Sequence, residues 1–219
     1  MYKQEFQVTT NYINNFYDGS IHDLVFLDLE WCRDFRKEGL VNNMIFGYTI
    51  TRILEGSSEQ YIKIQFIESR QQEKQILEDI LADIQLLQRK YFVGYGISTS
   101  DISCLRKRIF DMRLPLHVRE IKILDLQTKS RKKDLHQGLN SLFEHLGIQI
   151  NKKIKGEYVY RNGIKVLRKE IGHEQVLNNI YEYCLEDATN YFNIVTNWQD
   201  RFPLVHQASH VTLPLRYSS

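Results

Sequence analysis

Two acids separated by one residue, Asp28 and Glu30, stand at the end of the apolar segment 22–31. The composition of this segment is typical of a buried β-strand. Because residues i and i+2 of a strand face the same side, both carboxylates are expected to project together, roughly 7 Å apart along the chain. Buried carboxylates are costly unless water or a cation meets them. The alternative is that both acids lie just beyond the sheet edge, in water.

A third acid, Asp101, follows the predicted strand 91–97 and lies in the first turn of the next predicted helix, after Ser98-Thr99-Ser100. An acid in the first turn complements the helix dipole, which would make Asp101 a purely structural residue. The carboxyl end of a strand in an α/β sheet is, however, also the place where functional sites assemble. Asp101 is therefore a candidate for the same site as Asp28.

The last candidates, Tyr183 and Asp187, lie in a predicted long helix, 174–200. They are four residues apart, so they share one face of the helix. That face adjoins an apolar stripe through Cys184, which predicts that both side chains are at least half buried. A buried Asp near other acids calls for a metal or a base. The alternative is a tyrosine packed on the helix beside a solvated acid.

The order of these acids (strand, helix start, late helix) resembles that of the DEDD superfamily of 3′–5′ exonucleases, which has the ribonuclease-H-like fold. Segment 26–30 resembles the first motif of that superfamily, and segment 93–105 resembles the second. Tyr183 to Asp187 resembles the Tyr-x-x-x-Asp motif of the DEDDy branch. Segment 135–148 is similar to the helix that precedes this third motif. The resemblance covers roughly residues 22 to 200.

The resemblance implies a site for two divalent cations, Mg²⁺ or Mn²⁺. Asp28, Glu30 and Asp187 would hold one ion, and Asp28 with Asp101 would hold the other. Four carboxylates cannot stay ionised together without such cations. Two ions stabilise the attacking and leaving oxygens of a phosphoryl displacement. Tyr183 would orient the attacking water, and nucleoside 5′-monophosphates would be released from the 3′ end of single-stranded DNA or RNA.

Two positions depart from the family pattern. Trp31 stands where members usually have a small residue, and Gly96 stands where many have Asn. Neither position is a metal ligand in the family, so the departures concern how the terminal nucleotide is held. Trp31 is a candidate for stacking on a base. A wedge between its strand and a helix is the alternative role.

Segment 150–170 contains seven basic residues and two acids, a net charge of +5, whereas the whole chain carries +2. Asn162-Gly163 within segment 158–167 predicts a β-hairpin that carries these cations. Alternating cations and tyrosines suit phosphate contacts and base stacking, with a solvated hairpin as the alternative. The predicted nucleic-acid-binding residues are Trp31, Lys152, Lys153, Lys155, Tyr158, Tyr160, Arg161, Lys165 and Arg168.

Hydrophobic periodicity predicts the elements that position these residues. Three antiparallel strands are followed by alternating helices and strands, which predicts an α/β protein with a mixed five-stranded sheet flanked by helices. With the resemblance, this is a ribonuclease-H-like domain over residues 22–200, between an N-terminal extension (1–21) and a C-terminal tail (201–219). The predicted strands are 22–31, 44–54, 60–67, 91–97 and 120–126, and the predicted helices are 70–89, 98–112, 134–146 and 174–200.

Composition agrees with a folded domain, since 42% of the residues are hydrophobic and 26% are charged. No apolar run is long enough for a membrane helix, and the N-terminal residues do not resemble a signal peptide. The three cysteines are far apart, which argues against disulfides and a zinc ribbon. These features predict a cytoplasmic protein without a membrane partner.

The function predicted from the sequence is that of a metal-dependent 3′–5′ exonuclease. Two alternatives stay open: a catalytically silent nucleic-acid-binding module with the same fold, and a structure-selective endonuclease. The sequence does not choose between RNA and DNA, because contact with a 2′-hydroxyl depends on side-chain placement. Asp125, a further acid on a predicted strand, is assigned a structural role.

Overall fold

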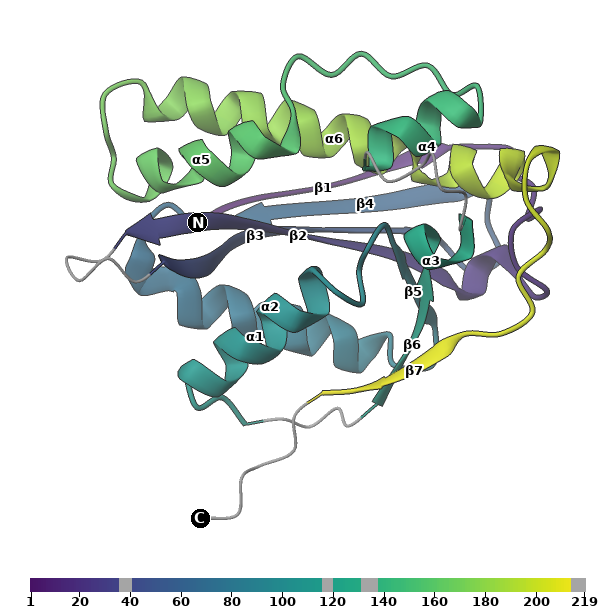
Figure 1. Cartoon of the computed structure of the whole chain (residues 1–219), viewed down its shortest axis with the longest axis horizontal. Coiled ribbons are helices and arrows are strands. Elements are labelled where there is room, and N and C mark those ends of the chain that lie inside the picture. The colour runs from purple at the N-terminus through teal and green to yellow at the C-terminus, as the bar shows by residue number, and fades with distance from the viewer. Residues whose placement is uncertain (36–40, 116–119, 131–137, 214–219) are drawn as a thin grey trace.

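A computed structural model describes residues 1–35, 41–115, 120–130 and 138–213, and a seven-stranded sheet forms its centre (Figure 1). The strand order is β1-β4-β3-β2-β5-β6-β7. Strand β3 is antiparallel to both of its neighbours, β2 and β4, and β5 and β6 continue the sheet parallel to β2, which confirms the predicted mixed sheet. The strands are β1 Tyr2–Thr9, β2 Leu24–Phe35, β3 Val41–Ile53, β4 Glu59–Phe66, β5 Tyr91–Gly94, β6 Glu120–Asp125 and β7 Ser209–Thr212.

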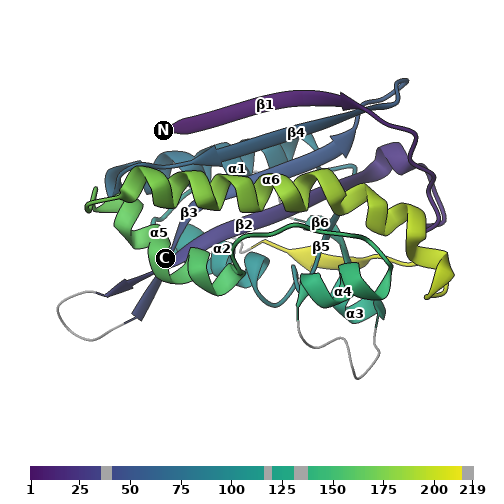
Figure 2. The ribbon, with the colours of Figure 1, turned by 90° about the horizontal axis from the view of Figure 1, so that it is seen from above.

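Helices cover both faces of this sheet (Figures 1 and 2). Helices α1 and α2 lie on one face, and α4, α5 and α6 lie on the other, with α6 running along the sheet. Part of the predicted helix 134–146 lies outside the described residues. Within the part of the chain that is described, no helix is long and apolar enough to span a bilayer. The helices are α1 Glu73–Leu86, α2 Asp101–Asp111, α3 Leu126–Ser130, α4 Leu139–His145, α5 Gly156–Leu167 and α6 His173–Asn197.

The sheet is wider than the five strands predicted, because β1 and β7 add an antiparallel strand at each edge. Both edge strands are mostly exposed, so they lack the alternation of apolar and polar residues by which buried strands are recognised. They also lie outside residues 22–200. The division of the chain into a domain and two terminal segments stays a prediction.

The predicted basic hairpin is wrong, since residues 156–167 form helix α5. Asn162-Gly163 is a turn signal when seen locally, but Gly163 serves helix packing here. A Cβ atom at Gly163 would lie 2.7 Å from the Phe46 ring and 2.9 Å from Cys32 Cβ, so glycine lets α5 approach the sheet closely. Val159, Val166 and other apolar residues of α5 are buried at helical spacing.

Strand β2 lies in the middle of the sheet and sends alternate side chains to opposite faces. Phe26 faces α6, where its ring stacks on Tyr191 with centroids 4.7 Å apart. Asp28 and Glu30 follow at two-residue intervals, so they point to the same face. Strand β2 therefore places two acids next to α6, within the apolar core.

Candidate active site

Asp28 and Glu30 both receive a hydrogen bond from α6. The Tyr191 hydroxyl donates to Asp28 Oδ2 at 3.0 Å, and the Cys184 thiol donates to Glu30 Oε1 at 3.0 Å. Glu30 is 7% exposed, whereas Asp28 retains partial solvent exposure. The structure therefore shows the predicted common orientation of the two carboxylates. It does not show the alternative, in which both acids lie in open water.

Asp101 joins them from the first turn of α2, and it is 5% exposed. Its Oδ1 accepts the backbone N–H of Leu29 at 3.3 Å, and its Oδ2 accepts the Ser100 hydroxyl at 2.8 Å. The bond to Leu29 ties the start of α2 to β2 between the two strand acids. Asp101 is thus fixed beside them.

Asp187 is 1% exposed and approaches from α6. Its Oδ1 forms an ion pair with the ammonium group of Lys152, which is also buried. Apart from this ion pair, neither Asp187 oxygen has a hydrogen-bond partner among the described residues. A buried carboxylate without hydrogen-bond partners destabilises the folded state.

The four acids of this carboxylate cluster (Asp28, Glu30, Asp101 and Asp187) act on one another's ionisation. Burial raises the pKa of each carboxyl, to about 7 for Asp187. The charge of Asp28 raises the pKa of the other three further, while Lys152 opposes the rise at Asp28 and Asp187. At neutral pH the cluster therefore favours a bound proton or cation over four negative charges.

Tyr183 lies one turn before Asp187 on α6. Its hydroxyl lies beside Gly156 at the start of α5, where an added Cβ atom would be 3.3 Å away. Burial, followed by the nearby carboxylates, raises the pKa of Tyr183 well above its usual value. Tyr183 therefore stays a hydrogen-bond donor at neutral pH.

The donor set of the cluster suits a hard divalent cation, because it consists of carboxylate oxygens and includes those of Asp187, whose one partner among the described residues is the Lys152 ammonium at Oδ1. As the side chains stand, no three His, Cys, Asp or Glu residues in the described ranges are grouped to ligate an ion. The Lys152 ammonium lies against Asp187 instead. The residues fit Mg²⁺ or Mn²⁺ by chemistry, and binding would require the side chains to converge further.

The predicted nucleic-acid-binding residues divide into two groups. Lys152 is buried in the carboxylate cluster, whereas the other cations of the set are exposed. Arg161, Lys165 and Arg168 recur at helical spacing, so they form one stripe on the outer face of α5. Partners on the protein surface are Glu182 for Lys153, Glu157 for Arg161 and Glu170 for Arg168.

Trp31 follows a β-bulge, since the pairing of β2 with β3 shifts register between Glu30 and Trp31. The shift directs Trp31 toward α5, where its ring meets Tyr160 edge-on with centroids 5.1 Å apart. Tyr158 and Tyr160 are partly buried rather than presented as a flat stacking platform. Trp31 thus contacts α5, as the wedge alternative expects, and its stacking on a base stays a prediction.

Sequence reasoning missed several residues that touch the cluster. Tyr191 lies four residues after Asp187, a spacing visible in the sequence, and its hydroxyl donates to Asp28. Lys152 belongs to the basic segment 150–170, and nothing in its neighbours signals burial. Asp125 instead accepts three backbone N–H groups, from Gly96, Ser98 and Gln127, which agrees with its predicted structural role.

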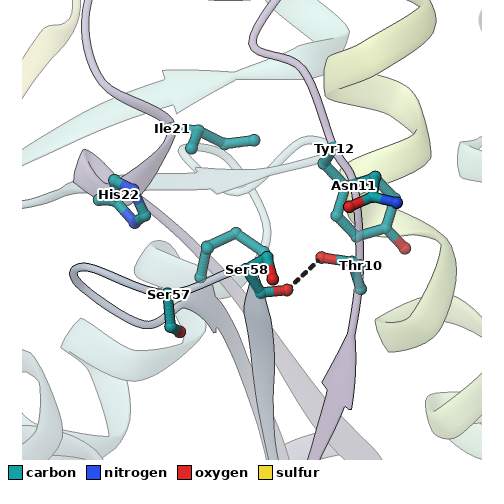
Figure 3. A pocket seen from close by; sticks show the side chains of 8 residues that line it. Thr10, Asn11, Tyr12, Ile21, His22, Ser57 and Ser58 are labelled. Atoms are coloured by element: carbon teal, nitrogen blue, oxygen red, sulfur yellow. Dashed lines mark hydrogen bonds between the residues drawn. The ribbon is translucent and has the colours of Figure 1, made fainter.

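A cavity of about 270 Å³ lies elsewhere in the fold, at the turn between β3 and β4 (Figure 3). Hydroxyl, amide and imidazole groups line it, and the Thr10 hydroxyl donates to the Ser58 carbonyl at 2.9 Å. No carboxylate is among its lining residues. This cavity is therefore separate from the carboxylate cluster and does not share its chemistry.

Three comparisons with known proteins bear on this site. The RNase_H_2 family, described as RNase_H superfamily, matches residues 25–199. No curated protein matches the chain. Among solved structures, the chain is similar to the family B DNA polymerase from the hyperthermophilic archaeon Pyrobaculum calidifontis, with 12% identity and a TM-score of 0.49. That similarity covers 80% of this chain and 27% of the polymerase chain, so this chain spans about a quarter of the polymerase's length.

Proposed function

Because the chain belongs to the RNase_H superfamily, which confirms the predicted ribonuclease-H-like fold, we propose that it is a metal-dependent 3′–5′ exonuclease of the DEDDy type. The observation that carries the proposal is the carboxylate cluster itself. Strand β2, the start of α2 and the middle of α6 bring Asp28, Glu30, Asp101 and Asp187 together, in the order expected for that branch.

In this proposal, Asp28, Glu30 and Asp187 would hold one Mg²⁺ or Mn²⁺ ion, and Asp28 and Asp101 would hold a second. Bound there, the ions would polarise the phosphate and lower the pKa of the attacking water. The raised pKa values of the four carboxyls support this assignment, because divalent cations would offset their mutual repulsion.

The surrounding residues hold the carboxylates in place. The Tyr191 hydroxyl orients Asp28, the Cys184 thiol orients Glu30, and the Leu29 N–H orients Asp101. Such outer contacts fix ligand geometry in metal sites. Tyr183, protonated at neutral pH, is proposed to donate a hydrogen bond that positions the attacking water near Asp187.

The proposed substrate is the 3′ end of single-stranded DNA or RNA. The stripe of Arg161, Lys165 and Arg168 on α5 offers cations to successive phosphates, on the same face of the sheet as the carboxylates. Contacts to phosphates are independent of base sequence, because every nucleotide carries the same phosphate. The products would be nucleoside 5′-monophosphates.

The test is to incubate 5′-labelled single strands of RNA and of DNA with the protein and either Mg²⁺ or Mn²⁺. A descending ladder of products supports the exonuclease. For variants of the cluster, the matched control is Glu174→Gln, which changes an exposed acid of α6. A single internal cut would identify an endonuclease instead. No cleavage of either strand would contradict nuclease activity.

A second candidate, a silent nucleic-acid-binding module, is favoured by one observation. The Lys152 ammonium already pairs with Asp187, so the cluster has a partial counterion without metal. A silent module would bind the labelled strands with a salt-dependent affinity and leave them intact.

A further inference from the structure

Lys152 is a cation placed inside the carboxylate cluster rather than on the surface. Its side chain is 3% exposed and its ammonium pairs with Asp187 Oδ1. The same ammonium donates to Asn140 Oδ1 at 2.8 Å and lies 4.4 Å from the centroid of the Tyr183 ring and 5.6 Å from that of Phe143. An acid, an amide and two aromatic faces thus surround the charge.

This burial has an electrostatic effect on the acids. Lys152 lowers the pKa of Asp28 and of Asp187, against the rise caused by burial. Removing a lysine from water costs several kcal/mol unless an opposite charge repays it. The cluster supplies that opposite charge, so the ion pair partly neutralises the acids in the protein without metal.

The ammonium and a divalent cation compete for the same atom. A cation such as Mg²⁺ binds carboxylate oxygens at about 2.0–2.1 Å, which is closer than an ammonium nitrogen approaches. Two positive groups on Asp187 Oδ1 would also repel strongly in a buried site. Binding of the metal at Asp187 therefore requires the ammonium to leave.

A cavity next to Lys152 offers the ammonium a place to go. This cavity of about 250 Å³ lies between α6 and the strap, which we define as residues 151–154. Lys152, Tyr183, Glu182 and Glu186 are among its lining residues. Glu186 accepts the Asn151 N–H at 2.9 Å, and Glu182 pairs with Lys153 at 2.7 Å. These contacts hold the strap in place. They also leave Glu182 and Glu186 in the lining of the cavity, near the displaced Lys152 side chain.

We propose that Lys152 is the resident counterion of the carboxylate cluster, and that a divalent cation at Asp187 displaces its ammonium into the cavity beneath the strap. The inference rests on the proposed function, since it uses the same metal site. It adds that the metal-free site is closed by an ion pair, so that metal binding and the Lys152–Asp187 contact exclude each other.

Calorimetric titration of Mn²⁺ into the wild type, Lys152→Met and Lys153→Met tests the competition. Methionine keeps most of the apolar stem and removes the charge. Lys152→Met should bind Mn²⁺ at least about tenfold more tightly than the wild type, because repulsion within a buried site is lost. Lys153→Met should bind like the wild type, since Lys153 is 74% exposed and pairs with Glu182. Unchanged or weaker binding by Lys152→Met overturns the inference.

A measurement on the wild type guards against misfolding of the variant. Lysine acetylation followed by mass spectrometry should label Lys152 several-fold faster when Mg²⁺ is added, while the labelling of Lys153 stays constant. If Mg²⁺ binds and Lys152 stays protected, the inference is wrong although the proposed metal site stands. If only Lys152→Met binds metal, the ammonium blocks the site instead of being displaced from it, so both the inference and the proposed metal-dependent function fail. If neither protein binds metal, both fail.

Discussion

Two buried charge networks lie on opposite faces of the sheet, and they are built on different rules. Between α1 and α2, the Arg108 guanidinium donates two hydrogen bonds to Glu73, both at 2.7 Å, and a third to Asp111 at 2.9 Å. Glu73 also accepts the Ile45 N–H at 3.3 Å. Each buried charge in this network has an opposite charge with aligned hydrogen bonds.

The carboxylate cluster beneath α6 contains four acids and the single amine of Lys152. Its negative charge is only partly compensated, and the pKa values of its carboxyls are raised. The difference indicates that the first network stabilises the fold, because its charges are balanced. The second network retains excess negative charge, which a bound cation can neutralise. The following predictions test this division.

The largest effect is expected from Asp28→Asn and Asp187→Asn. Each change should lower the cleavage rate roughly a thousandfold or more, because metal ions contribute several kcal/mol to the transition state. The free energy of unfolding without metal should hold or rise, since repulsion among the acids is relieved. Rate measurements on labelled strands and urea denaturation would check both parts. Activity near that of the Glu174→Gln control would show that the metal assignment is wrong.

Arg108→Met should have the opposite profile. Breaking a buried ion pair leaves Glu73 uncompensated and should lower the free energy of unfolding by about 3–5 kcal/mol. The cleavage rate per folded molecule should stay unchanged, because Arg108 pairs with Glu73 and Asp111 and not with the four acids of the cluster. Lys74→Met, which removes a largely exposed ion pair with Glu78, should change stability by less than about 0.5 kcal/mol. An equally small effect of Arg108→Met would remove the contrast between the two networks.

Tyr183→Phe keeps the ring and removes the hydroxyl. A role in positioning water predicts a fall in rate of roughly ten- to a thousandfold with little change in stability. Tyr181→Phe, on the same helix, removes a hydroxyl that donates to Gln4 on the edge strand β1 and should not affect the rate. Equal rates for both variants would leave Tyr183 a packing residue.

Local patterns in the sequence predicted which residues of the second network share a face of one strand or one helix. The two-residue spacing of Asp28 and Glu30 determines their common face once β2 is recognised as a strand. The four-residue spacing of Tyr183 and Asp187 likewise determines their common side of α6. These patterns depend only on the periods of strand and helix, which a sequence displays directly.

The features that the sequence did not predict depend on tertiary contacts. In the sequence, Gly163 suggests a turn. In the structure, the Phe46 ring lies so close that the helix has room only for a glycine there. Lys152 belongs to a basic run, and its burial follows from where the strap crosses α6. The edge strands β1 and β7 are mostly exposed, so their pairing leaves little trace in the apolar pattern.

The pH dependence of stability should also report on the cluster. Asp187 has a pKa of about 7 in the folded protein, above its value of 3.8 in the unfolded chain. Its protonation therefore contributes stability that is fully present below about pH 4 and is lost as the pH rises through about 7. In EDTA, the wild type should lose stability relative to Asp187→Asn between pH 5 and pH 8, as measured by urea denaturation. A constant difference would contradict the raised pKa.

The smallest effect concerns the stripe on α5. Replacing both Lys165 and Arg168 by Ala should weaken binding to all sequences alike. Loss of two phosphate contacts should flatten the slope of log affinity against log salt by about 1.4 for a single strand. Measuring binding in an Asp28→Asn background prevents cleavage during the titration. An unaltered slope would mean that the nucleic acid follows another path, such as past Arg106 and Lys107.

The most direct test of the carboxylate cluster is the cleavage of a 5′-labelled strand by metal-free protein to which Mn²⁺ is then added. The account predicts no products in EDTA, a descending ladder and nucleoside 5′-monophosphates with Mn²⁺, and no ladder from Asp28→Asn under the same conditions. Cleavage that proceeds equally in EDTA, or equally in Asp28→Asn, would contradict a metal-dependent site at these acids.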